Sequence, residues 1–227
     1  MDTALLLLAD SRLPAGGHAH SGGLEPAVSA GAVRDVAGLA AFLRGRLATS
    51  GLVAASLAAA ACAHAARDEA DGGADGAGWV VLDAEADART PSPAQRAASR
   101  AQGRSLLRAA RSTWPHPALA ALPGDAHHPV VLGAATAAAR GTPRDAASIT
   151  AYGAVTGPAS AAVRLLGLDP LSVHRALADL ARAVDAVADE AAAHATGPWR
   201  DLPAASAPVL DLYAELHIRA DLRLFES

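Results

Sequence analysis

Alanine is the residue that most narrows the folds open to this chain, because it occupies 63 of the 227 positions. Alanine is the strongest helix former and a poor strand residue. Aromatic residues make up only 3% of the sequence, and alternating runs of β-branched residues are almost absent. A chain of this length usually forms one domain with a core of its own. The sequence therefore predicts an all-α fold, a single-domain bundle of roughly eight to ten helices over residues 1–227.

Net charge, cysteine content and the absence of lysine argue against several classes of function. The net charge of −4 argues against broad binding to nucleic acid or to an anionic membrane. The single cysteine, Cys62, rules out a disulfide framework and a cysteine-rich zinc site. All 19 basic residues are arginine, so no lysine is available for Schiff-base or P-loop chemistry. The N-terminus is a poor signal peptide and the longest apolar run, Leu52–Ala63, is too short to span a bilayer, so we expect a cytoplasmic protein.

Proline and glycine mark where the helices begin and end. Ser92-Pro93, Thr142-Pro143 and Asp169-Pro170 each place a capping residue before a proline at the first helical position. The glycine-rich stretch 68–78 is predicted to be a flexible loop. The predicted helices span residues 35–48, 52–67, 79–87, 93–111, 130–140, 143–166, 170–197 and 209–222, with a break near Gly51. For residues 79–87 a short strand is the alternative.

Histidines are the first candidates for a metal site, since the chain has nine. His18 and His20 stand two residues apart in a glycine-rich segment, and on an extended backbone two such imidazoles can share a metal. No third ligand is implied nearby, and the alternative is that both rings pack or cap a turn. His127 and His128 precede Pro129, where adjacent histidines usually point apart. The sequence predicts no stable metal site, and a helical metal-dependent hydrolase using His18, His20 and His127 or His128 is the alternative function.

Motifs for nucleophilic or phosphate chemistry are missing. Ser21 follows His20, but no Gly-x-Ser-x-Gly follows a strand, and neither glycine pair near it matches a Walker or dinucleotide-binding loop. A Ser–His–Asp triad can be drawn from any chain with nine histidines, so the residue types alone identify none. We therefore predict no catalytic residue and expect a protein that is not an enzyme.

An arginine stripe and an aromatic C-terminus are the remaining unusual features. Like charges four residues apart are mildly unfavourable on a helix, so the stripe is either solvated, paired within the fold, or turned toward an acidic protein partner. Phe225 lies two positions from the end, which predicts a tail docked on the chain's own body or on a partner. The stripe consists of Arg96, Arg100, Arg104, Arg108 and Arg111, at successive spacings of 4, 4, 4 and 3.

Residues 8–25, LADSRLPAGGHAHSGGLE, resemble the opening signature of the UreF family of urease accessory proteins. That signature typically reads Leu-Pro-x-Gly-(Gly/Ala)-Phe-x-(Tyr/His)-Ser-x-Gly-Leu-Glu. This chain departs from it at His18, where the family usually has phenylalanine, and at His20, where tyrosine is common. Further matches are Arg96-x-x-Ser99-x-x-x-Gly103, His128-Pro129-Val130-Val131-x-Gly133, Tyr152 through Leu165, and Arg223-Leu224-Phe225-x-Ser227.

The resemblance implies a non-catalytic, all-α homodimer. Such a protein binds the accessory protein UreD, also called UreH, and then the GTPase UreG, and the assembly delivers nickel to apo-urease. Nickel is then handled transiently by the complex, with no cofactor bound stably. The C-terminal tail 220–227 is associated with recruitment of the GTPase. The implied partner-binding residues are Arg223, Leu224, Phe225 and Ser227 in the tail and Leu13, Pro14, Gly16, Ser21, Gly23, Leu24 and Glu25 in the N-terminal loop 11–25, to which the stripe adds Arg96, Arg100 and Arg104.

Overall fold

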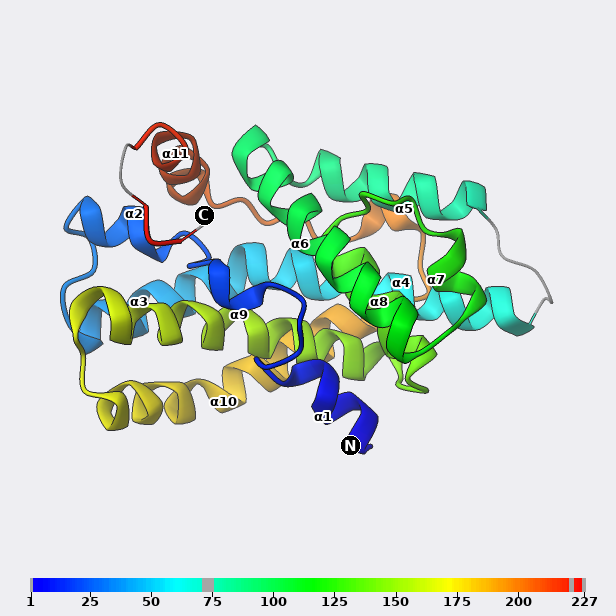
Figure 1. Ribbon diagram of the computed structural model, residues 1–227, viewed down its shortest axis with the longest axis horizontal. Coiled ribbons are helices and arrows are strands. Elements are labelled where there is room, and N and C mark those ends of the chain that lie inside the picture. Colours follow the sequence, from blue (N-terminus) through cyan, green and yellow to red (C-terminus); the bar gives the residue numbers. More distant parts are fainter. Residues whose placement is uncertain (1, 71–75, 221–222, 226–227) are drawn as a thin grey trace.

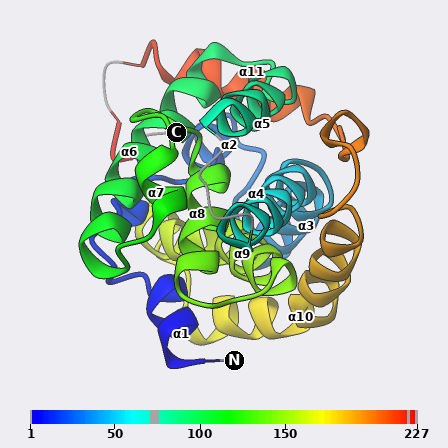
Figure 2. The same ribbon diagram turned by 90° about the vertical axis from the view of Figure 1, so that its right-hand side faces the viewer.

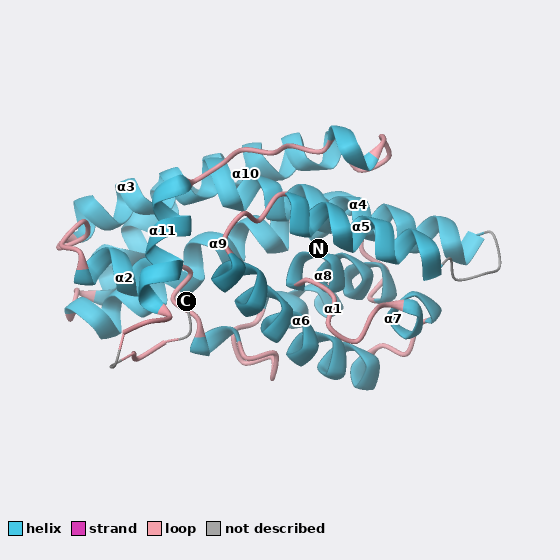
Figure 3. Cartoon of the chain, turned by 90° about the horizontal axis from the view of Figure 1, so that it is seen from above, coloured by secondary structure: helices cyan, strands magenta, loops and turns pink. Residues whose placement is uncertain are grey.

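The computed structural model describes residues 2–70, 76–220 and 223–225. Over these residues the chain consists of helices and loops without a strand, which confirms the predicted all-α bundle (Figure 3). The helices are α1 (Thr3–Ala9), α2 (Leu24–Ser29), α3 (Val36–Arg46), α4 (Leu52–Ala70), α5 (Gly76–Ala88), α6 (Pro93–Thr113), α7 (Pro117–Ala121), α8 (His128–Ala138), α9 (Pro143–Leu166), α10 (Pro170–Ala193) and α11 (Pro208–His217).

Helix α4 forms the centre of the bundle and packs against α8, α9 and α10 (Figures 1 and 2). Most of its residues are buried, which is typical of a helix that is apolar on every side. Small side chains bring α4 and α8 into close contact, because a Cβ at Gly133 would overlap the carbonyl oxygen of Ala58. The alanine excess therefore supports close helix packing as well as helix formation.

Two large hydrophobic clusters fill the interior, and α4 contributes to both. The first surrounds Trp79 and Leu106 and takes Leu57 from α4. The second surrounds Leu39 and Leu180 and receives α4 alanines such as Ala59. The clusters lie on different faces of one helix, so the chain has a continuous interior.

The three predicted helix starts are confirmed. The Ser92 side chain accepts a hydrogen bond from the backbone N–H of Gln95. Thr142 and Asp145 form a capping box at the start of α9. Asp169 accepts from two backbone N–H groups at the start of α10. Each cap satisfies N–H groups that the helix itself cannot pair.

The predicted break near Gly51 is wrong. A π-turn, Leu47–Gly51, joins α3 to α4 and produces one continuous helical segment. Interior glycine costs a helix only about 1 kcal/mol, and burial on both sides of the junction outweighs this cost. The joined helix, Val36–Ala70, is long and apolar enough to cross a membrane by length and composition, but 78% of its most apolar window is buried inside the protein.

Other boundaries also differ from the predictions. Residues 68–70 and 76–78 of the predicted flexible loop are helical, and residues 71–75 lie outside the described residues. The N-terminal loop 11–25 ends early, since Leu24 and Glu25 belong to α2. The predicted helix 209–222 ends at His217, and α7 forms in a segment where no helix was predicted.

Candidate functional site: the N-terminal loop and the C-terminal tail

Glycines shape the N-terminal loop that carries the Leu-Pro-x-Gly signature. Gly16, Gly22 and Gly23 have φ angles of +77°, +61° and +86°, a region that residues with a side chain rarely adopt. At Gly22 a side chain would also press against Pro158, whose Cγ lies 3.0 Å from an ideal Cβ position. The buried hydroxyl of Ser21 then accepts the backbone N–H of Glu25 at 3.2 Å. The loop therefore has a defined path that delivers Glu25 to the first turn of α2.

The carboxylate of Glu25 holds the C-terminal tail. Its two oxygens accept the backbone N–H groups of Leu224 at 2.8 Å and Phe225 at 2.9 Å. The Nε2 atom of His217 lies 3.4 Å from the same carboxylate and 3.1 Å from the carbonyl oxygen of Phe225. Because a carbonyl oxygen only accepts, His217 Nε2 carries the hydrogen and donates a hydrogen bond to the Phe225 carbonyl oxygen. Two buried side chains thus satisfy three backbone groups of the tail.

The Phe225 ring anchors the tail in the second hydrophobic cluster. The residue is 5% exposed, and the guanidinium carbon of Arg164 lies 4.3 Å from the ring centroid. That geometry is a cation–π contact. Leu224 is 75% exposed and Arg223 is also exposed. The described part of the tail docks on the chain's own body, with Phe225 inward and its two predecessors outward; Ser227 lies outside the described residues.

The other predicted loop residues divide between interior and surface. Leu24 is fully buried and Leu13 packs against the first cluster, whereas Pro14 is exposed. An ideal Cβ at Gly16 would lie 3.7 Å from Ser105, so the loop rests on α6. Gly23 caps the start of α2. In this chain Ser21, Leu24 and Glu25 are positioned to shape the loop and hold the tail.

The arginine stripe divides into paired and unpaired members. Arg96 donates to the carbonyls of Thr90 and Pro91, and Arg111 donates to that of Leu119. Arg104 and Arg108 are exposed and have no ion-pair partner in the described part of the chain. Pairing within the fold, one of the three interpretations left open, therefore applies to Arg96 and Arg111 and, as described next, to Arg100.

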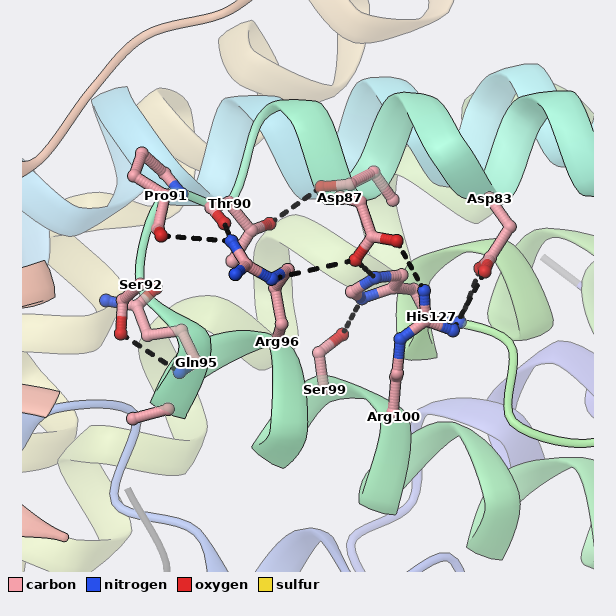
Figure 4. A network of polar contacts seen from close by, with 12 residues as sticks. Asp83, Asp87, Thr90, Pro91, Ser92, Gln95, Arg96, Ser99, Arg100 and His127 are labelled. Carbon is pink, nitrogen blue, oxygen red and sulfur yellow. Dashed lines mark hydrogen bonds and ion pairs between the residues drawn. The ribbon is translucent and has the colours of Figure 1, made fainter. Parts of the chain in front are cut away.

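A polar network joins α5, α6 and the start of α8 (Figure 4). Arg100 donates to Asp83 at 2.9 Å and to Asp87 at 2.7 Å. His127, 1% exposed, donates its backbone N–H to Asp83 at 2.7 Å, and its Nε2 lies 2.9 Å from Asp87 Oδ1. Burial raises the pKa of Asp87, but hydrogen bonds from His127 and Arg100 outweigh burial and the pKa lies below its ordinary value. The carboxylates of α5 are thus the intramolecular partners of Arg100, and Asp87 also lies 3.9 Å from Arg96 Nε.

Ser99 completes a hydrogen-bonded series with His127 and Asp87. The Oγ atom of Ser99 lies 3.0 Å from His127 Nδ1 and also accepts the backbone N–H of His128 at 3.3 Å. These are the residue types of a hydrolase triad, in a place that sequence reasoning missed. The signal was present, since Asp83 and Asp87 are four residues apart on a predicted helix and match the spacing of Arg96 and Arg100. With Arg100 on Asp87 and the His128 N–H on Ser99, the series ties three helices together.

Among the side chains that the structure describes, the histidines are not brought together as a metal site; the side chain of His18 lies outside them. No three described His, Cys, Asp or Glu side chains are grouped so as to hold a metal ion. Both ring nitrogens of His127 are occupied by Ser99 and Asp87. Burial, with a contribution from His20, lowers the pKa of His128 to about 4. Nothing in the described residues supports the hydrolase alternative that used these side chains.

These features define a class of all-α proteins in which a Leu-Pro-x-Gly loop meets an Arg-Leu-Phe tail. The family model described as UreF matches residues 33–181. A urease accessory protein UreF from Mycolicibacterium vanbaalenii is 47% identical over 223 residues, covering 98% of this chain and 97% of the relative. Those from Mycobacterium marinum and Mycobacterium tuberculosis are 44% and 43% identical, each covering 98% of this chain and 97% of the relative. The chain belongs to the UreF family of urease accessory proteins.

Proposed function

We propose that this chain is a non-catalytic scaffold of urease maturation that joins UreD, or UreH, to the GTPase UreG and assists GTP-dependent nickel delivery to apo-urease. It works as a cytoplasmic homodimer. The observation that carries the proposal is the docked tail, which turns Arg223 and Leu224 outward while Phe225 is buried. Residues near a terminus are usually poorly ordered unless contacts hold them, and the contacts of Phe225 hold Arg223 and Leu224 at the surface, where a partner can reach them.

The surface beside the tail supports a protein partner. Helix α11 exposes Leu212 at 64% and Leu216 at 62%, and Ile218 just beyond it is 52% exposed. His217, on the same helix, holds the tail, so the end of α11 lies beside the docked tail. A group of large exposed apolar residues is typical of a protein-binding surface.

Nickel is the cargo of the proposed complex, and this chain holds it at most transiently. Imidazole nitrogen suits nickel, and His18 with His20 is the pair that stands where the family has aromatic residues. Calorimetric titration with nickel, comparing the wild-type chain with the double variant His18→Ala, His20→Ala, tests this role. Equal heats for the two proteins would show that His18 and His20 do not bind nickel.

Co-purification tests the scaffold itself. The chain is expressed with candidate UreD and UreG proteins from the same genome, and the mass of the complex is read by light scattering. We expect UreG to join only when this chain is present. Arg223→Ala should weaken UreG capture, while Arg219→Ala, an exposed arginine four positions earlier, should leave it intact. Normal capture by a chain lacking residues 223–227 would contradict the proposal.

A further inference from the structure

A cavity lined by both polar and apolar side chains lies between the N-terminal loop and helices α3, α4, α5, α6, α8 and α11. Its volume is about 200 Å³. Since a water molecule takes about 30 Å³ in the liquid, the cavity has room for several waters or for one ion of a few heavy atoms. Pockets for nucleotides and drug-sized ligands start at about 300 Å³, so the cavity suits a smaller guest.

Arg46 is the charged group in the cavity wall that lacks a counter-ion. Its Nε donates to the carbonyl of Ala154 at 3.2 Å, and Nη1 lies 3.5 Å from the Ser50 hydroxyl. No acidic side chain in the described part of the chain pairs with it, and its remaining N–H groups have no acceptor there. Burial lowers the pKa of Arg46 to about 10, which still leaves it charged at neutral pH. An uncompensated cation in a partly buried place is costly, and a bound anion would offset that cost.

The other ionisable groups of the cavity are neutral or already satisfied. Arg89 pairs with Glu85 and donates to backbone carbonyls that include those of Trp199 and Leu202. Burial raises the pKa of Asp211, and the Ser92 backbone N–H bonds to it. His127 is engaged as described above, and the lowered pKa of His128 leaves its ring uncharged at neutral pH. Arg46 is therefore the cation of the lining without an acidic partner among the described residues, and Asp211, which keeps its Ser92 contact, is the acidic residue of the lining.

Neutral hydrogen-bond donors accompany Arg46. The side-chain amides of Gln95 and Gln102 line the cavity and have no hydrogen-bond partner among the described residues. The Ser50 hydroxyl lies on the same wall. A guanidinium fork together with amide and hydroxyl donors is the usual recognition set for carboxylate and phosphate oxygens. Gly22 keeps the fork accessible, since an ideal Cβ there would lie 3.2 Å from Arg46 Nη2.

We propose that this cavity is a binding site for a small oxoanion, with Arg46 as its charged ligand and Gln95, Gln102 and Ser50 as neutral donors. The tail residues Leu224 and Phe225 do not line the cavity, whereas α11 contributes both to the cavity wall and to the surface used in the proposed scaffold role. An anion there would join the N-terminal loop to α3, α6 and α8, and would stabilise the folded chain by mass action.

Thermal unfolding of the full chain tests the site. The Tm is measured in sodium phosphate, sulfate, acetate and chloride at matched ionic strength. We expect the oxoanions to raise Tm above its value in chloride for the wild-type chain. Arg46→Gln should abolish that difference, while Arg44→Gln, an exposed arginine on the same helix, should preserve it. The proposal is overturned if chloride and the oxoanions give equal Tm for the wild type, or if Arg46→Gln responds as the wild type does.

A second measurement covers the case in which Arg46→Gln fails to fold. Wild-type crystals soaked in selenate should show an anomalous peak inside the cavity, within hydrogen-bond distance of the Arg46 guanidinium. A cavity without such a peak, in crystals that bind selenate nowhere or only on the surface, would rule the site out.

Discussion

Glu25 and Phe225 are 200 positions apart in the sequence, yet Glu25 Oε2 accepts the Phe225 backbone N–H at 2.9 Å. The same carboxylate also accepts from Leu224. The two ends of the chain that carry the family signatures thus form one structural unit. The final Leu-Glu of the N-terminal signature is explained by this contact, because the leucine is buried in the core and the glutamate receives the tail.

Replacing Glu25 by glutamine should release the tail without unfolding the protein. The amide keeps one acceptor oxygen and turns the other position into a donor that opposes a backbone N–H. Leaving that buried group unpaired costs about 1–3 kcal/mol of docking free energy. Hydrogen exchange at Leu224 and Phe225 should accelerate in Glu25→Gln and stay slow in Glu190→Gln, an exposed glutamate of α10. Unchanged exchange in both variants would show that Glu25 does not hold the tail.

Arg100 and Arg108 should differ sharply in their contribution to stability. Arg100→Gln leaves the Asp83 carboxylate without its cation and leaves Asp87 with His127 and the more distant Arg96. Breaking a buried pair costs about 3–5 kcal/mol, reduced here because Asp87 is 43% exposed. Arg108→Gln touches no partner in the described chain and should change stability by less than about 0.5 kcal/mol. Urea unfolding measures both. Similar losses of unfolding free energy in the two variants would contradict the division of the stripe into paired and unpaired arginines.

Gly133→Ala should destabilise the contact between α4 and α8. A Cβ at this position overlaps the carbonyl oxygen of Ala58, and backbone atoms of a central helix cannot easily move away. Overpacking of this kind costs at least about 1–3 kcal/mol. Gly157→Ala on α9 is the matched control, since nothing lies within 4 Å of its Cβ position, and it should stabilise the helix by up to about 1 kcal/mol. Thermal unfolding of both variants gives the comparison, and an unchanged Tm in Gly133→Ala would contradict the predicted destabilisation.

Acid should destabilise the fold through His128. Its pKa falls from the ordinary 6.5 to about 4 in the folded chain, mainly through burial. Between these values the unfolded chain takes up a proton that the folded chain refuses, so stability is retained above pH 6.5 and declines as pH falls toward 4. The slope from this one group is at most about 1.4 kcal/mol per pH unit. His128→Asn should flatten the dependence of unfolding free energy on pH, and His174→Asn, at an exposed position, should not.

The helix starts were predictable because their signals are local. At Ser92, Thr142 and Asp169 a capping side chain and a proline act within one turn, and the structure confirms all three. The continuity of the segment through Gly51 was not predictable in this way. Whether a glycine ends a helix depends on what buries its two flanks, and α9 and α10 supply that burial from positions more than ninety residues later.

The residues of the candidate site could be predicted from the sequence, but the contacts between them could not. The motifs identified Glu25 and Phe225 separately, but composition and spacing could not show that they bond to each other. The ion pairs of the arginine stripe were likewise not predictable from the sequence, because they depend on which helix packs against α6. Asp83 and Asp87 decide that Arg100 is structural, while Arg104 and Arg108 have no such neighbour among the described residues.

Helix α4 places Leu57 in one hydrophobic cluster and Ala59 in the other, so neither cluster is complete without it. Loosening the packing of either cluster therefore exposes apolar surface on the same central helix, α4. We expect heat or denaturant to melt the chain in a single cooperative transition, with no half that survives alone. Fragments cut at the junction between α5 and α6 should accordingly fail to fold separately, and they should regain structure only when mixed.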